Sequence, residues 1–335
     1  MASSSVDHGI GGTDTSSLDV LHPEIIETRV LAKLDGRSIA SVACTSNLLR
    51  TLCNRKSLWR GICNSTWDSV KHPLVQQTIC SFPGSYRSFY NDSFPVLCSS
   101  RTKKGGLRDQ VKTRELISAV DIHYEKNPVH SKVLVTNVHA SSFPQSLFCV
   151  DLIESNETVE MPLKYEGDEN KCMLKLEEKL TLSWIVIDPT LKRAANVSSS
   201  RPVCVKPYWD GTSIKVIYAT ILSGDSCGIY KTEFVECRIV AIFGCEEGKN
   251  IELRKLSFCV VDMERTRLKG EKTLRILQEA MVSGQRKKRN GEAKEVYSKY
   301  LSILSERDVK KRRQNMLYSV LWIITVSFWF SSPFA

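Results

Sequence analysis

Apolar residues recur at helical spacing over the first ordered stretch of the chain, from Leu18 to Cys63. Pro23 can start a helix there because its missing N–H would be unpaired at that position in any case. Gly36 can end this helix, and Ser38 can cap the next one. The pattern predicts three short helices within about 46 residues. Their apolar stripes are Ile26, Val30, Leu31 and Leu34, then Ile39, Val42, Ala43, Leu49 and Leu52, then Leu58, Trp59 and Ile62.

A three-helix block of this size cannot bury much of its surface by itself. Its apolar positions also outnumber what one stripe per helix requires. We therefore expect the helices to complete their burial against the rest of the chain or against a partner protein.

Beyond Glu115 the pattern changes to short runs of β-branched and aliphatic residues, separated by Pro, Gly, Asn or charged clusters. These runs predict an antiparallel sandwich or a curved sheet. No period of roughly 20 to 50 residues repeats, which excludes leucine-rich repeats, kelch blades and WD blades. The seven runs are Leu116 to Tyr124, Lys132 to Thr136, Leu147 to Leu152, Leu180 to Asp188, Ser213 to Leu222, Phe234 to Phe243 and Ile251 to Val261.

The segments around these two blocks differ in character. Residues 1–17 are rich in Ser, Gly and Thr and predict a flexible tail. Residues 66–114 contain Phe82-Pro83-Gly84 and a polar stretch from Arg101 to Arg108, which predict a connector of turns and a loop. We interpret its aromatic residues as packing residues, with a peptide groove as the alternative. Residues 266–313 predict basic, amphipathic helices.

The charge of the chain is concentrated in one segment. The 335 residues have a formal net charge of +10. Sixteen of the 47 cationic and six of the 37 acidic residues lie between Arg265 and Arg313, so 31 of each sign remain elsewhere. A broad basic face of the kind that nucleic-acid-binding proteins need is therefore excluded. The local basic segment has three interpretations: a nuclear import signal, a contact with an anionic membrane, or a solvated helix face.

The twelve cysteines show no zinc-site spacing, and several lie inside apolar runs. Such cysteines are typical of reduced thiols in the core of an intracellular protein. The N-terminus lacks the pattern of a signal peptide. We therefore expect a cytoplasmic or nuclear location, and neither a metal nor another cofactor.

No sequence pattern points to catalysis. A nucleotide-binding loop, a nucleophile elbow and a His-Glu-x-x-His motif are all missing from the sequence, and His123, His130 and His139 have no metal-site spacing. We expect no catalytic residue and no enzyme activity. The segment Asp188 to Asn196 is interpreted as a turn, with substrate contact as the alternative. Trp209 is interpreted as a packed turn aromatic, with a glycan or peptide platform as the alternative.

The last 22 residues, from Gln314 to Ala335, carry no charge. As a helix they would span about 33 Å, close to the thickness of a bilayer core. Together with the preceding basic cluster from Lys310 to Arg313, this predicts a C-terminal membrane anchor whose main body faces the cytosol. A buried terminal helix and an alternative-transcript tail are the other interpretations.

The helical block resembles the F-box motif. The matching elements are Pro23-Glu24-Ile25-Ile26, Val30-Leu31, Leu34, Ile39, Val42-Ala43-Cys44 and Leu58-Trp59. Two later stretches, Phe82 to Phe89 and Leu182 to Pro189, are similar to a plant F-box group, and the resemblance covers roughly residues 18 to 285. F-box proteins are substrate receptors of cullin-based ubiquitin ligases.

The resemblance implies an F-box at residues 18–65 that binds a Skp-type adaptor and, through it, a cullin. The implied fold class is α+β: a three-helix F-box, a mostly antiparallel β-rich domain at residues 115–265 that recruits an unknown target protein, and C-terminal helices. A membrane-tethered β-sandwich of lectin-like or lipid-associated kind is the first alternative, and an enzyme built on the β domain is the second. The residues implied to contact the adaptor by desolvated packing are Pro23, Ile26, Val30, Leu31, Leu34, Ile39, Val42, Leu58 and Trp59.

Overall fold

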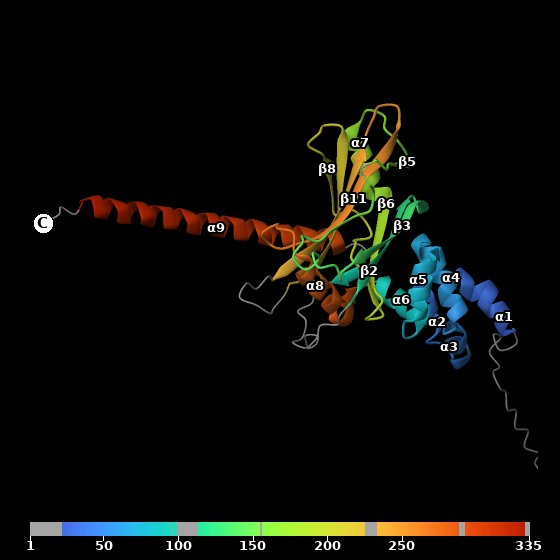
Figure 1. Cartoon of the computed structure of the whole chain (residues 1–335). Coiled ribbons are helices and arrows are strands. Elements are labelled where there is room, and N and C mark those ends of the chain that lie inside the picture. Colours follow the sequence, from blue (N-terminus) through green and yellow to red (C-terminus); the bar gives the residue numbers. More distant parts are fainter. Residues whose placement is uncertain are drawn as a thin grey trace, which may run out of the picture. The chain divides into compact units, whose positions relative to one another are not determined.

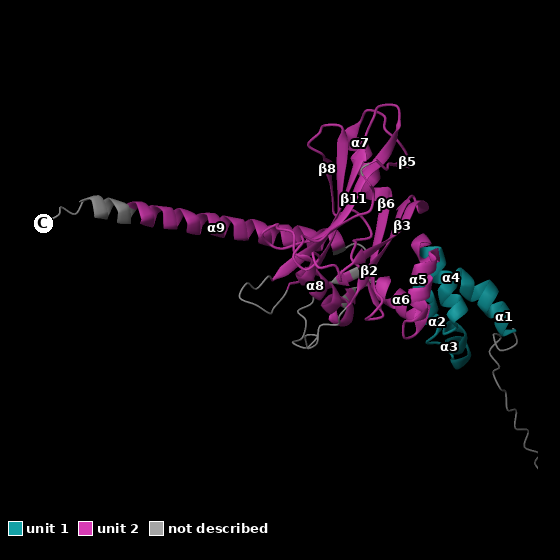
Figure 2. Cartoon of the chain, in the orientation of Figure 1, with its two compact units in different colours: residues 1–66 teal, residues 67–335 magenta. Residues whose placement is uncertain are grey.

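The computed structural model describes residues 22–94, 96–98, 113–154, 156–224, 233–287 and 292–331. The chain divides into two compact units, Met1–Thr66 and Trp67–Ala335, which we call unit 1 and unit 2 (Figure 2). The predicted tail at residues 1–17 and the polar stretch from Arg101 to Arg108 lie outside the described residues.

Unit 1 is helical, as the apolar stripes predict, but its helices are shorter and more numerous than three. The structural reason is that the first predicted helix changes its hydrogen-bond pattern twice, from an α turn to a π turn to a 3₁₀ turn. The elements are α1 (Pro23–Ile25), η1 (Ile26–Val30), η2 (Leu31–Lys33), α2 (Gly36–Val42), α3 (Asn47–Cys53) and α4 (Lys56–Thr66).

The cap of α2 is Asp35, and the prediction that Ser38 caps this helix is wrong. The Asp35 carboxylate accepts a hydrogen bond from the Ser38 N–H at 2.8 Å, and hydrogen bonding to Ser38 holds the pKa of this carboxyl below its ordinary value. Ser46 caps α3 in the same way, accepting from the Leu49 N–H at 3.2 Å. Both caps satisfy N–H groups that the first turn of a helix leaves unpaired.

Unit 2 begins with helices where the sequence predicts turns and a loop. They are η3 (Asp68–Lys71), α5 (Pro73–Cys80) and α6 (Ser85–Ser93), followed by the short strand β1 (Val96–Cys98). The aromatic side chains of this segment pack together: Trp67 meets the edge of Phe89 with ring centroids 5.7 Å apart, and Phe82 lies 6.3 Å from Phe89. Phe82, Tyr86, Phe89 and Tyr90 are all buried. Packing, rather than a peptide groove, is therefore their role.

Two antiparallel sheets form the body of unit 2 (Figure 1), as the β-branched and aliphatic runs predict. All seven predicted strands are present. The four-stranded sheet has the order β3-β2-β6-β7, with β2 (Glu115–Tyr124), β3 (Asn127–Asn137), β6 (Leu180–Asp188) and β7 (Arg193–Asn196). The six-stranded sheet has the order β4-β11-β10-β9-β8, with β5 also paired to β11; its strands are β4 (Cys149–Asp151), β5 (Val159–Lys164), β8 (Cys204–Pro207), β9 (Ser213–Ser223), β10 (Phe234–Gly244) and β11 (Asn250–Val261).

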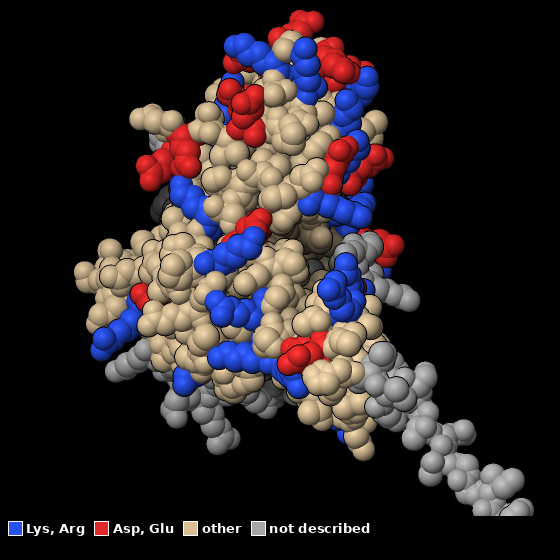
Figure 3. All heavy atoms as spheres, turned by 90° about the vertical axis from the view of Figure 1, so that its right-hand side faces the viewer, with Lys and Arg blue, Asp and Glu red and all other residues tan. Residues whose placement is uncertain are grey.

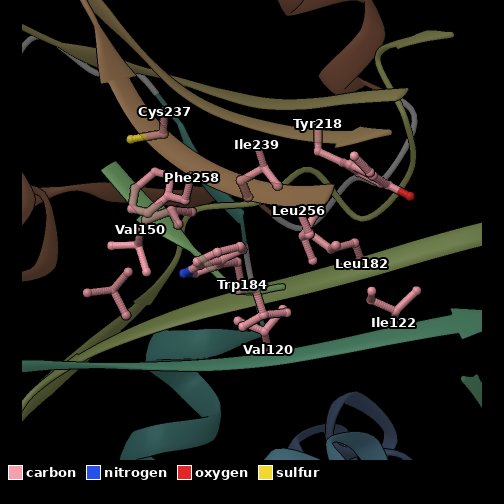
Figure 4. Packing of buried hydrophobic residues seen from close by; sticks show 14 of the residues in the cluster. Val120, Ile122, Val150, Leu182, Trp184, Tyr218, Cys237, Ile239, Leu256 and Phe258 are labelled. Carbon is pink, nitrogen blue, oxygen red and sulfur yellow. The ribbon is translucent and has the colours of Figure 1, made fainter. Parts of the chain in front are cut away.

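The inner faces of the two sheets share one hydrophobic core. Figure 4 shows Trp184 of β6 between the sheets, with Val120 of β2 on one side and Phe258 and Leu256 of β11 on the other. The rings of Trp184 and Phe258 are 5.4 Å apart, and the indole N–H of Trp184 donates to Ser118 Oγ at 3.1 Å. The helix α7 (Glu169–Lys179), which the sequence patterns do not predict, adds Cys172 and Leu176 to this core.

A buried carboxylate joins the beginning and the end of unit 2. Asp92 of α6 accepts two hydrogen bonds from the Arg193 guanidinium, at 2.9 and 3.0 Å, and one from the Ala194 N–H at 3.1 Å. Arg286 lies 3.3 Å from the same carboxylate. Arg286 belongs to β12 (Gln285–Lys287), which follows α8 (Gly270–Ser283) and pairs with β1. The three charged groups thus tie α6, β7 and β12 together.

The last helix, α9 (Glu292–Ser331), continues through the basic segment into the apolar tail (Figure 1). Its first turns cover part of the outer face of the six-stranded sheet, where Tyr297, Tyr300 and Leu304 pack with Ile217 and Ile221. From Met316 to Ile323 its large apolar side chains are exposed.

The prediction of a membrane-spanning helix is not supported, because no described helix has a stretch both long enough and apolar enough to cross a bilayer. The uncharged part of α9 continues a helix whose preceding residues, up to Arg313, are strongly charged. Residues 332–335, and the side chains from residue 324 onward, lie outside the description.

We expect Asp92→Ala to lower the free energy of unfolding of the chain by about 3 to 5 kcal/mol, because two guanidinium groups lose their buried counter-ion. Urea unfolding measures this change. Glu166→Ala is the matched control: Glu166 forms an exposed ion pair with Lys171, and because solvent screens such a pair, its loss should change the free energy of unfolding much less than the loss of Asp92 does. Equal losses in the two variants would contradict the joining role of Asp92.

Candidate functional site

The structure places the nine predicted adaptor-binding residues at different depths in unit 1. Five are buried, namely Ile26, Leu31, Ile39, Leu58 and Trp59. Pro23, Leu34 and Val42 are half-buried, and Val30 is exposed. The five buried side chains therefore build the interior of the helical block, and the other four remain accessible at its surface.

Ile25 joins the accessible set, although its neighbour Ile26 was the predicted contact. Ile25 is 48% exposed and Ile26 only 1% exposed. In a π turn the hydrogen bonds join residues five apart, so Val30, which is 46% exposed, lies one such turn beyond Ile25. The paired aliphatics at positions 25 and 26 were the available signal, since one member of such a pair must face outward when the other is buried.

Glu27 fixes the turn that carries Ile25 and Val30. Its carboxylate forms an ion pair with Arg55 and accepts a hydrogen bond from Ser57 Oγ at 2.8 Å. Ser57 belongs to α4, so these contacts join η1 to the start of α4. Nearby, the Trp59 indole N–H donates to the Cys53 carbonyl at 2.7 Å and links the end of α3 to α4. The accessible residues are thus held on a braced set of short helices.

The residues that the sequence offers as candidates for metal binding or substrate contact do not form such a site within the described ranges. Across the described ranges, no group of three His, Cys, Asp or Glu side chains is arranged to hold a metal ion. Asp188 is buried and accepts hydrogen bonds from the N–H groups of Thr190 and Leu191 and from the side chains of Thr113 and Gln278. The interpretation as a turn is therefore confirmed for residues 189–192, whereas Arg193–Asn196, predicted to belong to the same turn, form the strand β7.

Trp209 is not packed as the sequence analysis predicts. We interpreted it as a packed turn aromatic, but its side chain is 85% exposed. It lies in the turn between β8 and β9, where the N–H of Tyr208 donates to the Ser213 carbonyl at 2.8 Å. The tight turn is closed by backbone and Asp210 contacts, so the indole is not needed for its packing.

Three proteins of Arabidopsis thaliana are similar to the chain over most of its length. "F-box protein At2g27310" is 32% identical, covering 93% of this chain and 94% of that protein. "Probable F-box protein At2g36090" is 35% identical, covering 94% and 91%. "F-box protein At3g44326" is 34% identical, covering 85% and 80%. The chain belongs to the F-box proteins. No family model and no solved structure matches this F-box protein.

The family membership of this plant F-box protein concerns both of its units. The similarity runs through both units, so the β-rich domain belongs to the resemblance as well as unit 1. Figure 2 shows the two units in separate colours. The accessible apolar residues of unit 1 are therefore the candidate docking surface of an F-box protein.

We expect Glu27→Ala to loosen η1 and the first turn of α4, because the charge-assisted contacts of Glu27 are worth about 1 to 2 kcal/mol. Amide hydrogen exchange of residues 23–66 should become roughly 5- to 30-fold faster there. Glu24→Ala is the control, since the Glu24 carboxylate lies in an exposed contact with His22. Unchanged amide exchange in the Glu27 variant would show that the contacts of Glu27 with Arg55 and Ser57 do not stabilise these helices.

Proposed function

We propose that this F-box protein is a substrate receptor of a cullin-based ubiquitin ligase. In this role unit 1 binds a Skp-type adaptor, and unit 2 recruits a target protein. The observation that carries the proposal is the exposure of Ile25 and Val30, beside half-buried Pro23, Leu34 and Val42, on a braced helical unit. The family membership of the chain supports it.

The physical basis of adaptor binding is desolvation. Fully burying an exposed Ile or Val side chain is worth about 1.5 to 3 kcal/mol. Ile25 and Val30 are each about half exposed, so covering both contributes about 2 kcal/mol, or roughly 30-fold in affinity. The five buried residues of the motif act indirectly, by holding the accessible ones in place.

The protein works in this proposal without catalysing a reaction. It positions a target near the ligase, and the transfer of ubiquitin is the task of other subunits. The expected compartments are the cytoplasm and the nucleus. A membrane contact of the C-terminal tail stays a prediction.

Replacing both accessible residues tests the adaptor role. We expect Ile25→Ser with Val30→Ser to weaken capture of a purified Skp-type adaptor roughly 30-fold, because the variant loses apolar surface that the adaptor would cover. The equilibrium dissociation constant, measured by surface plasmon resonance with the full chain, gives the result.

The matched control is Val135→Ser with Leu174→Ser, which removes apolar side chains of similar exposure from unit 2. This control should bind the adaptor like the unmodified chain. If the Ile25 and Val30 variant also binds unchanged, or if the unmodified chain captures no adaptor, the proposed role is wrong, and a binding module outside a ubiquitin ligase becomes the better hypothesis.

A further inference from the structure

The outer face of the six-stranded sheet has a part that α9 covers and a part on which lysines are accessible. The first turns of α9 cover one part, around Ile217, Ala219 and Ile221. The other part carries three lysines in one row across four strands. Lys206 of β8 lies opposite Lys215 of β9, Lys215 lies opposite Ile242 of β10, and Ile242 lies opposite Lys255 of β11. We call Lys206, Lys215 and Lys255 the lysine row.

The lysine row faces away from the core. Val205, Val216 and Leu256 are sequence neighbours of the three lysines. Val216 and Leu256 lie in the core between the sheets, and the half-buried Val205 packs against it. Because successive side chains of a strand point to opposite faces, the lysines lie on the outer face. Lys206 and Lys255 are exposed, and Lys215 is half-buried between them.

The charges of the lysine row are not compensated within the described part of the chain. None of the ion pairs between described residues includes one of the three lysines. The acidic residues Glu246 and Glu252 at this end of the sheet contact Arg254 instead. Burial, and then the nearby charges of Lys206 and Arg238, lower the pKa of Lys215. Like charges directly opposite in a sheet destabilise it, so a bound anion would relieve this repulsion.

An exposed aromatic side chain adjoins the lysine row. Trp209 lies in the turn that joins the strands of Lys206 and Lys215, and its ring is 5.5 Å from that of Tyr208. Exposed Trp and Tyr side chains are strong anchors when a partner covers them. The row therefore combines cations with an apolar anchor at one end.

We propose that the lysine row and Trp209 form the surface on which unit 2 docks an acidic protein segment containing an aromatic or aliphatic residue. This rests on the proposed function, since the segment would belong to the recruited target. A protein segment fits better than a nucleic acid. Outside Arg265 to Arg313 the chain carries 31 residues of each charge sign, so it lacks the broad basic surface that nucleic-acid binding needs. The side of the molecule that Figure 3 turns toward the viewer likewise carries both signs over its upper part.

The spacing of the lysine row suits an extended peptide that crosses the strands. Neighbouring strands are about 4.8 Å apart, so the row spans roughly 14 Å from β8 to β11. An extended peptide covers that distance with four or five residues at about 3.3 Å each. Two or three of its carboxylates can then reach the lysines, while a flanking apolar side chain meets Trp209.

Peptide binding to the full chain tests the proposal. The probe is a fluorescein-labelled nonapeptide with eight glutamates around one central phenylalanine, and the readout is fluorescence anisotropy at fixed salt. We expect Lys206→Glu with Lys215→Glu and Lys255→Glu to weaken binding at least tenfold. The control changes the same charge on exposed lysines elsewhere, Lys126→Glu with Lys192→Glu and Lys299→Glu, and should alter affinity less than twofold.

Trp209→Ser separates the aromatic anchor from the charges. It should weaken binding of the phenylalanine peptide several-fold and leave unchanged the binding of a peptide with serine in its place. Equal losses in the row variant and the charge control overturn the proposal. So does a polyuridine oligonucleotide or a phosphatidylserine vesicle that binds through the lysine row more tightly than the peptide does.

The adaptor measurement keeps this proposal distinct from the proposed function. The row variant should bind the Skp-type adaptor like the unmodified chain, because its changes lie in unit 2. Loss of peptide binding with normal adaptor capture supports both proposals. If adaptor capture is normal but peptide binding does not depend on the lysine row, only the proposed docking surface is wrong. If the chain captures no adaptor, the proposed ligase role is wrong.

Discussion

The carboxylate of Asp92 is the contact that holds the beginning of unit 2 against a strand near its end. It binds Arg193, which is 101 residues away in sequence, and Arg286, whose guanidinium also donates to the Asp92 carbonyl, 194 residues away. Burying these charges is costly unless every one is paired and hydrogen-bonded, and here the carboxylate accepts from two guanidinium N–H groups and one backbone N–H. Because β12 is held against β1 at this point, α9 begins close to the sheet that it covers.

Other buried acids join the parts of unit 2 in the same manner. Asp121 of β2 accepts from the N–H and hydroxyl of Ser69 at 2.7 and 2.5 Å, which ties η3 to the four-stranded sheet. Burial raises the pKa of this carboxyl, so its ionised form depends on these hydrogen bonds. Asp188 gathers Thr113 and Gln278 at the end of β6. The helical start of unit 2, its sheets and α8 are therefore positioned by directional polar contacts as well as by the shared core.

The sequence predicts those parts of the structure that carry their own pattern. The seven predicted strands follow from runs of β-branched and aliphatic residues, and the stripes of unit 1 follow from helical spacing. The short strands β5, β7 and β8 were missed, because four to six residues give too little pattern. The helices from Asp68 to Ser93 are stabilised by aromatic packing that no local pattern reveals. At the candidate site, helical spacing predicts one stripe through Ile26, Val30 and Leu31, but the structure buries Ile26 and Leu31 and exposes Val30. This spacing of five residues fits the π turn at Ile26–Val30 and not a 3.6-residue period.

The two parts of the outer face of the six-stranded sheet differ in whether their charged side chains have partners of opposite charge within the described residues. Beneath α9, Glu236 is buried and pairs with Arg238 at 2.6 Å. Burial against the sheet raises the pKa of Tyr297 of α9 to about 12. Further along α9, Arg307 and Lys311 pair with Glu264, and Asp308 pairs with Arg265. Where the chain covers its own sheet, each of these cations has an acidic partner. The lysine row lies on the same face, beyond the helix and without such partners among the described residues. An added carboxylate therefore gains more favourable electrostatic energy there than beside the cations that are already paired.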